Sequence, residues 1–221
     1  MVNKKLPSVS EQILGLAKDI LNFTVPDPAS TTQVPRNCVL DIDASGSMLD
    51  EDWQPTRLEG AQQAAKAFIK RLRFEEPEAK VAIVAYSDDA DLICDLSPVT
   101  NYRELERNID SIYTMGATNI TAGLEMTYDL IKNIRSLAQV VVLSDGYHNT
   151  GAEPKSISDK LRKSAIIECV GIGGSPIDVD EELLKYIASS YPDGKKRYRW
   201  IGDKERLVKH FHNLAGRIVR A

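Results

Sequence analysis

Residues 40–48 read LDIDASGSM, and this stretch decides the fold because a buried strand runs directly into a polar turn. Residues 37–42 are mostly apolar and β-branched, which is typical of a central strand that is covered on both faces. The strand is followed by one carboxylate and two hydroxyls at alternate positions, Asp43, Ser45 and Ser47. Such oxygen ligands suit Mg²⁺, Mn²⁺ or Ca²⁺ rather than zinc or copper. A helix N-cap with two serines is the alternative interpretation of this turn.

Two later segments contribute side chains of the same kind. Residues 115–124, MGATNITAGL, place Thr118 in a glycine-bearing loop just before a helical pattern. Residues 140–146, VVVLSDG, form a second buried strand that is followed by Asp145. The chain therefore offers two carboxylates and three hydroxyls from three strand-end or loop positions, which is a donor set suited to a hard cation.

This combination of motifs resembles the metal-ion-dependent adhesion site of the von Willebrand factor A (vWA) family. The family pattern is D-x-S-x-S, then a threonine in G-x-T-N, then an aspartate in a T/S-D-G turn. All five positions are filled here, by Asp43, Ser45, Ser47, Thr118 and Asp145. The resemblance implies that the hydroxyls bind Mg²⁺ or Mn²⁺ directly, with Ca²⁺ as a further option, while the aspartates act partly through water. It also implies that a Glu or Asp of a partner protein completes the shell of the cation.

Length and composition predict one α/β domain with an N-terminal appendage. The chain has 221 residues, of which 43% are hydrophobic and 27% charged, as expected for a globular protein with a full core. We expect residues 1–35 to form an amphipathic helix and a proline-rich linker, and residues 36–221 to form the vWA domain. Strands that alternate with helices predict a doubly wound, mainly parallel, Rossmann-like sheet with one antiparallel edge strand and helices on both faces.

The predicted topology places the candidate ligands at one edge of the sheet. In doubly wound sheets, ligands bind outside the carboxyl ends of the strands, near the point where the strand order reverses. Asp43 and Asp145 each follow a strand, so they meet at that edge if the two strands are neighbours, as they are in the vWA family.

Cysteine use and hydropathy predict a cytoplasmic protein. Cys38, Cys94 and Cys169 lie in or beside apolar strand-like runs, as buried free thiols do, and the chain contains no C-x-x-C pair. No apolar run reaches the roughly 20 residues that cross a membrane. We therefore expect no membrane partner. The C-terminal part of the chain is basic, but Leu207, Phe211 and Leu214 fall at helical spacing among the charges, which favours a solvated helix face, so we do not expect a nucleic acid as a partner either.

Two other functions remain open at this point. Asp41-x-Asp43 also resembles the first motif of haloacid-dehalogenase-like phosphatases, in which Asp41 would be the nucleophile and Asp43 the general acid/base beside Mg²⁺. That interpretation leaves the G-A-T-N loop unexplained and finds no late acidic pair after a strand. The other alternative is a structural subunit that docks through its N-terminal helix or its basic C-terminus.

The sequence favours a non-enzymatic adaptor or scaffold subunit of the intracellular bacterial type. In this hypothesis a bound Mg²⁺ or Mn²⁺ ion coordinates an acidic residue of a partner protein. By analogy with intracellular members of the family, the partner would be an AAA+ ATPase or a multi-subunit assembly.

Overall fold

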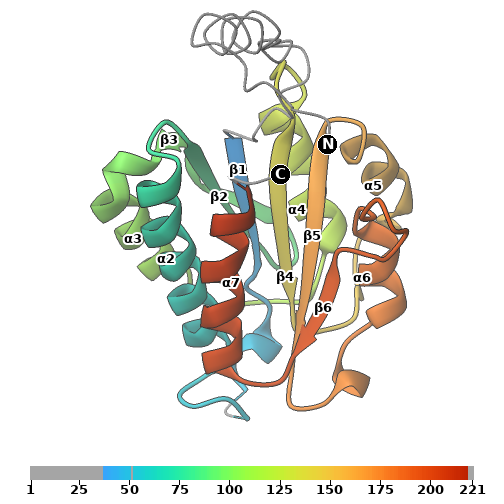
Figure 1. Ribbon diagram of the computed structural model, residues 1–221. Coiled ribbons are helices and arrows are strands. Elements are labelled where there is room, and N and C mark those ends of the chain that lie inside the picture. Colours follow the sequence, from blue (N-terminus) through green and yellow to red (C-terminus); the bar gives the residue numbers. More distant parts are fainter. Residues whose placement is uncertain (1–36, 51, 219–221) are drawn as a thin grey trace, which may run out of the picture. The chain divides into compact units, whose positions relative to one another are not determined.

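The computed structural model describes residues 37–50 and 52–218, and the expected N-terminal helix and linker lie outside the described residues (Figure 1). Six strands form one sheet. They are β1 (Asn37–Asp43), β2 (Lys80–Tyr86), β3 (Ala90–Pro98), β4 (Ala138–Ser144), β5 (Ala165–Ile172) and β6 (Tyr198–Ile201). Their order is β3-β2-β1-β4-β5-β6, and all neighbours are parallel except β2 and β3. The predicted mainly parallel sheet with one antiparallel edge strand is confirmed.

Helices cover both faces of this sheet. They are α2 (Arg57–Glu75), α3 (Tyr102–Asp110), α4 (Ile120–Ile131), α5 (Lys155–Leu161), α6 (Glu181–Ile187) and α7 (Lys204–Ile218), with short 3-10 turns η2 (Gly46–Leu49), η3 (Val99–Asn101) and η4 (Pro176–Asp178). Helices α2, α3 and α7 lie on one face, and α4, α5 and α6 lie on the other (Figure 1). Among the described residues, no helix is long and apolar enough to cross a bilayer.

Alternate residues of β1 point into two separate hydrophobic cores. Leu40 and Ile42 pack in the cluster shared with α2 and α7, whereas Val39 packs in the cluster shared with α4, α5 and α6. Phe68 of α2 and Phe211 of α7 meet edge to face, with ring centroids 6.4 Å apart. Because β1 is buried on both faces, most of its residues are apolar, as in other central parallel strands, with Asp41 and Asp43 as buried exceptions.

The strand order reverses at β1. From this strand the chain continues to β2 and β3 on one side, and β4, β5 and β6 then build the sheet on the other side. The carboxyl ends of β1 and β4 therefore flank the switch point, where ligands of doubly wound sheets bind.

Helix α6 is shorter than its sequence pattern predicts. The pattern predicts a helix over residues 179–190, but the structure has α6 over Glu181–Ile187. Asp180 caps its start by accepting a hydrogen bond from the backbone N–H of Leu183. The chain is already extended at Ala188, and the next N–H, that of Ser189, donates to the carbonyl oxygen of Ile167 in β5. Pairing with a strand thus competes successfully with the last turn of the helix.

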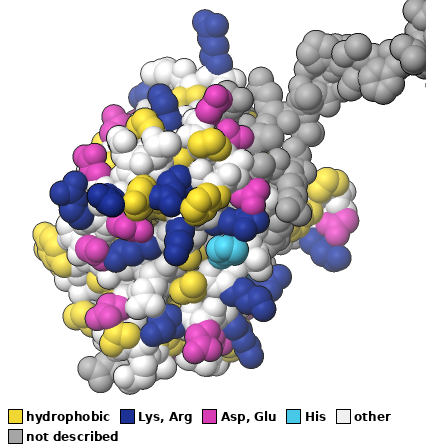
Figure 2. All heavy atoms as spheres, turned by 60° about the vertical axis from the view of Figure 1, so that its left-hand side comes forward, with side chains coloured by type: hydrophobic (Ala, Val, Ile, Leu, Met, Phe, Trp, Pro, Cys, Tyr) yellow, Lys and Arg dark blue, Asp and Glu magenta, His cyan; other side chains and the backbone are white. Residues whose placement is uncertain are grey.

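Figure 2 shows the side of the domain that carries α2 and α3. Lys and Arg side chains are interspersed there with Asp and Glu, and apolar side chains are scattered among them. An ion pair between Lys66 and Asp110 joins α2 to α3. Because opposite charges mix on this face, it presents no extended surface of one sign to a charged partner.

Candidate metal site

Two aspartates lie at the ends of neighbouring parallel strands. Asp43 is the last residue of β1, Asp145 follows β4, and Ile42 pairs with Leu143 just before them. The two aspartates are 0% and 1% exposed. The sheet therefore brings both carboxylates to the edge where the strand order reverses.

Hydrogen bonds orient Asp43 and join it to the second strand. Its Oδ1 accepts from the backbone N–H of Ser45 at 2.9 Å, and its Oδ2 accepts from the hydroxyl of Ser144 at 2.8 Å. Ser45 Oγ lies 3.2 Å from Ser47 Oγ, and the Ser47 hydroxyl donates to Asp145 Oδ1 at 2.9 Å. A hydroxyl that donates its proton to a carboxylate still has lone pairs to offer to a cation.

Thr118 reaches the same place from the loop before α4. A Cβ placed on Gly146 would lie 3.9 Å from both Thr118 Oγ1 and Ser47 Oγ, so the two hydroxyls face a common point. The backbone N–H of Thr118 donates to Asn149 Oδ1 at 2.9 Å, and the N–H of Asn149 donates back to the Thr118 carbonyl oxygen at 3.1 Å. The structure thus gathers all five predicted residues at one edge of the sheet.

The loop that carries Thr118 is also held against the turn after β1. The N–H of Met115 donates to the carbonyl oxygen of Ala44 at 2.9 Å, and Gly46 donates to the carbonyl oxygen of Gly116 at 3.1 Å. Gly116 has φ of 66°, and a Cβ there would lie 2.1 Å from a carboxylate oxygen of Asp88. A side chain at this position would strain the backbone and displace the carboxylate of Asp88, which favours glycine here.

Arg57 is a residue of this site that sequence reasoning missed. Thr56 caps α2, so Arg57 stands at the start of the helix, facing the strand ends. Its Nη1 donates to Asp145 Oδ2 at 2.9 Å, and its Nε and Nη2 donate to the two oxygens of Asp52 at 2.8 and 2.6 Å. The only signal in the sequence was an arginine shortly after an acidic run, and a solvated turn has the same pattern.

Burial and neighbouring charges shift the pKa values of the acidic groups. Burial, followed by the charge of Asp145, raises the pKa of Asp43 to about 7. Burial also raises the pKa of Asp145, against the lowering effect of its hydrogen bond from Arg57. The hydrogen bond from Arg57 lowers the pKa of Asp52. A nearby cation favours the ionised form of a buried carboxyl group, so a cation bound at this edge would displace protons from these acids.

Asp41 lies behind Asp43 on the same face of β1 and is also 0% exposed. Its Oδ2 accepts from the hydroxyl of Thr127 at 3.2 Å, while its Oδ1 has no hydrogen-bond partner. Burial raises the pKa of Asp41 to about 8. Gly123 of α4 makes room for it, since a Cβ there would lie 2.6 Å from Asp41 Oδ1. Burial beneath α4 therefore favours the neutral form of Asp41.

The donor set fits a hard divalent cation. The converging groups are all oxygens, two carboxylates and three hydroxyls. Within the described parts of the chain, no three His, Cys, Asp or Glu side chains are grouped to hold a metal, so a cation at this edge would depend on the hydroxyls. With two carboxylates only, part of the coordination shell remains for water or an incoming ligand.

The comparison with known families agrees with this geometry. The von Willebrand factor type A domain model matches residues 38–148, a segment that includes the turn after β1, Thr118 and Asp145. The chain belongs to the von Willebrand factor type A domain family. Domains of this family commonly serve in protein–protein interaction.

Two relatives carry names that state no function. The chain is 31% identical over 189 residues to the uncharacterized protein YfbK of Escherichia coli (strain K12). This aligned region covers 81% of the chain and 30% of YfbK. The chain is 26% identical over 201 residues to a UPF0353 protein of Mycolicibacterium gilvum (strain PYR-GCK), covering 76% and 58% of the two chains. The chain thus spans less than two thirds of either relative.

Solved structures share the fold. The von Willebrand factor type A protein from Catenulispora acidiphila superposes with a TM-score of 0.71 and 21% sequence identity, over 84% of this chain and 43% of that one. This similarity supports the architecture described above and says nothing about a ligand.

Proposed function

We propose that this protein is an adaptor or scaffold subunit that binds a partner protein through Mg²⁺ or Mn²⁺. The observation that carries the proposal is the convergence of five oxygen-bearing side chains at the switch point of the sheet. Ser45, Ser47 and Thr118 would hold the cation, and Asp43 and Asp145 would neutralise it. When bound, the cation supplies an electrophilic centre for a Glu or Asp carboxylate of the partner.

Exposed apolar side chains around this edge favour a protein as the ligand. Leu49 follows the turn after β1, Met115 precedes Thr118, and Tyr147 follows Asp145; these three side chains are 57%, 52% and 51% exposed. Large apolar side chains that surround a polar centre are characteristic of protein interfaces. The rim therefore offers contact area that a free inorganic anion would not need.

The phosphatase alternative requires Asp41 as its nucleophile, and the burial of this residue argues against that role. Asp41 has no exposed surface, and α4 covers it at Gly123. A nucleophile must reach the reacting phosphorus atom, which a carboxyl group in this position does not do. For this reason we favour binding over catalysis at this edge.

Cation binding is the first test. We expect Mn²⁺ to bind the wild-type protein in isothermal titration calorimetry, and Ser45→Ala/Ser47→Ala to weaken binding on the order of 100-fold, because two of the hydroxyl donors are lost. A matched control is Ser111→Ala/Ser156→Ala, which removes two exposed hydroxyls elsewhere. Equal Mn²⁺ affinity in the wild type and the site variant would refute the proposal.

Partner binding is the second test. The immobilised protein is expected to retain a partner from cytoplasmic extract in Mg²⁺ and to release it in EDTA, and the Ser45→Ala/Ser47→Ala variant is expected to retain none. By family-level analogy, we propose AAA+ ATPases and multi-subunit assemblies as the partners to look for. A cytoplasmic location is part of the proposal, and it fits the three buried, unpaired cysteines.

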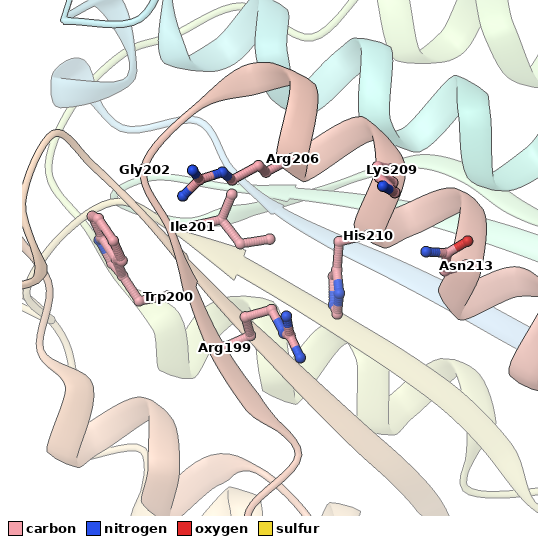
Figure 3. A pocket seen from close by; sticks show the side chains of 8 residues that line it. All are labelled: Arg199, Trp200, Ile201, Gly202, Arg206, Lys209, His210 and Asn213. Atoms are coloured by element: carbon pink, nitrogen blue, oxygen red, sulfur yellow. The ribbon is translucent and has the colours of Figure 1, made fainter.

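A basic pocket supports a second candidate function, docking through the C-terminal part of the domain. A cavity of about 430 Å³ lies between β6 and α7 (Figure 3). Strand β6 contributes Arg199 to its lining, and α7 contributes Arg206, Lys209 and His210. A partner held there would carry acidic side chains, and its binding would depend on salt rather than on Mg²⁺.

A further inference from the structure

Arg57 connects three loops around the candidate metal site. Its guanidinium bridges Asp145 after β4 and Asp52 in the loop before α2. Asp52 Oδ2 also accepts from the backbone N–H of Gly174, in the loop after β5, at 2.8 Å. Asp50 lies close as well, with its Oδ2 at 3.5 Å from Arg57 Nη1. Arg57 is only 6% exposed, whereas the side chains of Asp50 and Asp52 are 58% and 30% exposed. Within this network, the contact between Arg57 and Asp145 is therefore the part that is shielded from water and salt.

The two oxygens of Asp145 face different partners. Oδ1 accepts from the Ser47 hydroxyl at 2.9 Å, on the side where the donors converge, whereas Oδ2 accepts from Arg57 Nη1 at 2.9 Å. A cation among the hydroxyls would meet Oδ1, while Arg57 keeps Oδ2. The guanidinium and the cation would therefore share one carboxylate and repel each other across it.

We propose that Arg57 is an internal counter-ion that lowers the affinity of the site for divalent cations. This inference rests on the proposed function, because it concerns the same site. Arg57 takes up part of the negative charge of Asp145 and places a positive charge next to the cation. Asp52 acts in the opposite direction, since its carboxylate neutralises Arg57 through two charged hydrogen bonds.

Because Arg57 lowers the affinity for the cation, tight cation binding comes to depend on the partner protein. A carboxylate from the partner brings a negative charge that offsets the repulsion between Arg57 and the cation. Each ligand then favours the binding of the other, and the cation binds tightly only when the partner is present. Without Arg57 the site is expected to hold its cation with less help from the partner.

The sign of the effect distinguishes this role from simple positioning. If Arg57 only held Asp145 in place, its removal would disorder the carboxylate and weaken cation binding. If its charge dominates, its removal strengthens binding, because the carboxylates that it neutralised become available. The two roles therefore predict opposite changes for the same substitution.

The experiment measures Mn²⁺ affinity by isothermal titration calorimetry at low salt. Arg57→Gln is expected to bind Mn²⁺ roughly tenfold more tightly than the wild type, and Asp52→Asn several-fold more weakly. The double variant is expected to lie near the wild type, because the two charge changes cancel. Arg71→Gln is the matched control, since it removes a guanidinium from the same helix roughly 20 Å further along, and it is expected to change nothing.

The outcomes separate the two proposals. Weaker or unchanged binding in Arg57→Gln, with normal binding in the wild type, overturns the inference and leaves the metal site standing. Absence of Mn²⁺ binding in the wild type and in every variant overturns the proposed function as well. If Arg57→Gln does not fold, as judged by circular dichroism, Asp52→Asn alone decides: several-fold weaker binding in that variant supports the role given to Arg57, and unchanged or tighter binding contradicts it.

Discussion

The candidate metal site and the basic pocket hold their charges in opposite ways. Asp43 and Asp145 are almost completely buried, and each of their four carboxylate oxygens accepts a defined hydrogen bond. In the pocket, the side chain of Arg206 is 78% exposed and pairs with Asp203, the residue before α7. Buried charges with fixed partners define a geometry, whereas exposed charges create a field that salt screens. Of these two regions, the candidate metal site is therefore the one whose polar groups are preorganised.

The largest expected change in the free energy of unfolding comes from the buried side of α7 rather than from its exposed charges. Phe211→Ala should lower the free energy of unfolding by about 3–5 kcal/mol, because it removes a buried ring that packs on Phe68. Urea unfolding measures the loss, with Lys209→Ala, on the exposed side of the same helix, as control. A loss below about 1 kcal/mol would show that α7 is not anchored by this contact.

An intermediate effect concerns the buried acids at the metal-site edge. The native pKa of Asp41 is about 8, above the ordinary value of 3.8, so the folded protein holds this proton more tightly than the unfolded chain does. The stability that the proton contributes is complete below pH 3.8 and is lost as the pH rises through 8. In EDTA, the free energy of unfolding should therefore fall towards pH 8, with a slope of up to about 1.4 kcal/mol per pH unit from this residue.

Asp41→Asn should flatten that slope, because the amide does not ionise. Urea unfolding at several pH values between 5 and 8 measures the change, and Asp159→Asn, an exposed acid on α5, serves as control. An unchanged slope in Asp41→Asn would mean that Asp41 is already ionised in the folded protein over this pH range.

The smallest effect on stability is expected at the pocket. Lys209→Glu should change the free energy of unfolding by less than about 0.5 kcal/mol, because the side chain is exposed, and it should leave Mn²⁺ affinity unchanged. A partner that binds through the pocket would be lost in this variant, whereas one that binds through Mg²⁺ would be retained. Affinity capture with the wild type and with Lys209→Glu therefore shows which of the two regions contacts the partner.

Much of the fold follows from local patterns. The pattern over residues 165–172 predicts β5 with the bounds observed, because an apolar, β-branched run is buried in any arrangement of the sheet. The end of α6 was predicted wrongly, since the extended chain there pairs with β5 through Ser189. A helix end that depends on a neighbouring strand leaves no mark in the local sequence.

The sequence by itself determined the strands, their alternation with helices, and the kinds and order of the five oxygen donors, because these features lie in short contiguous motifs. Only the tertiary structure decided that Arg57 joins the site, since it is 88 residues away from Asp145 along the chain. The same holds for Asp41, whose neutral state depends on the approach of α4 at Gly123. Charge and protonation depend on which distant groups burial brings together, and no local pattern contains that information.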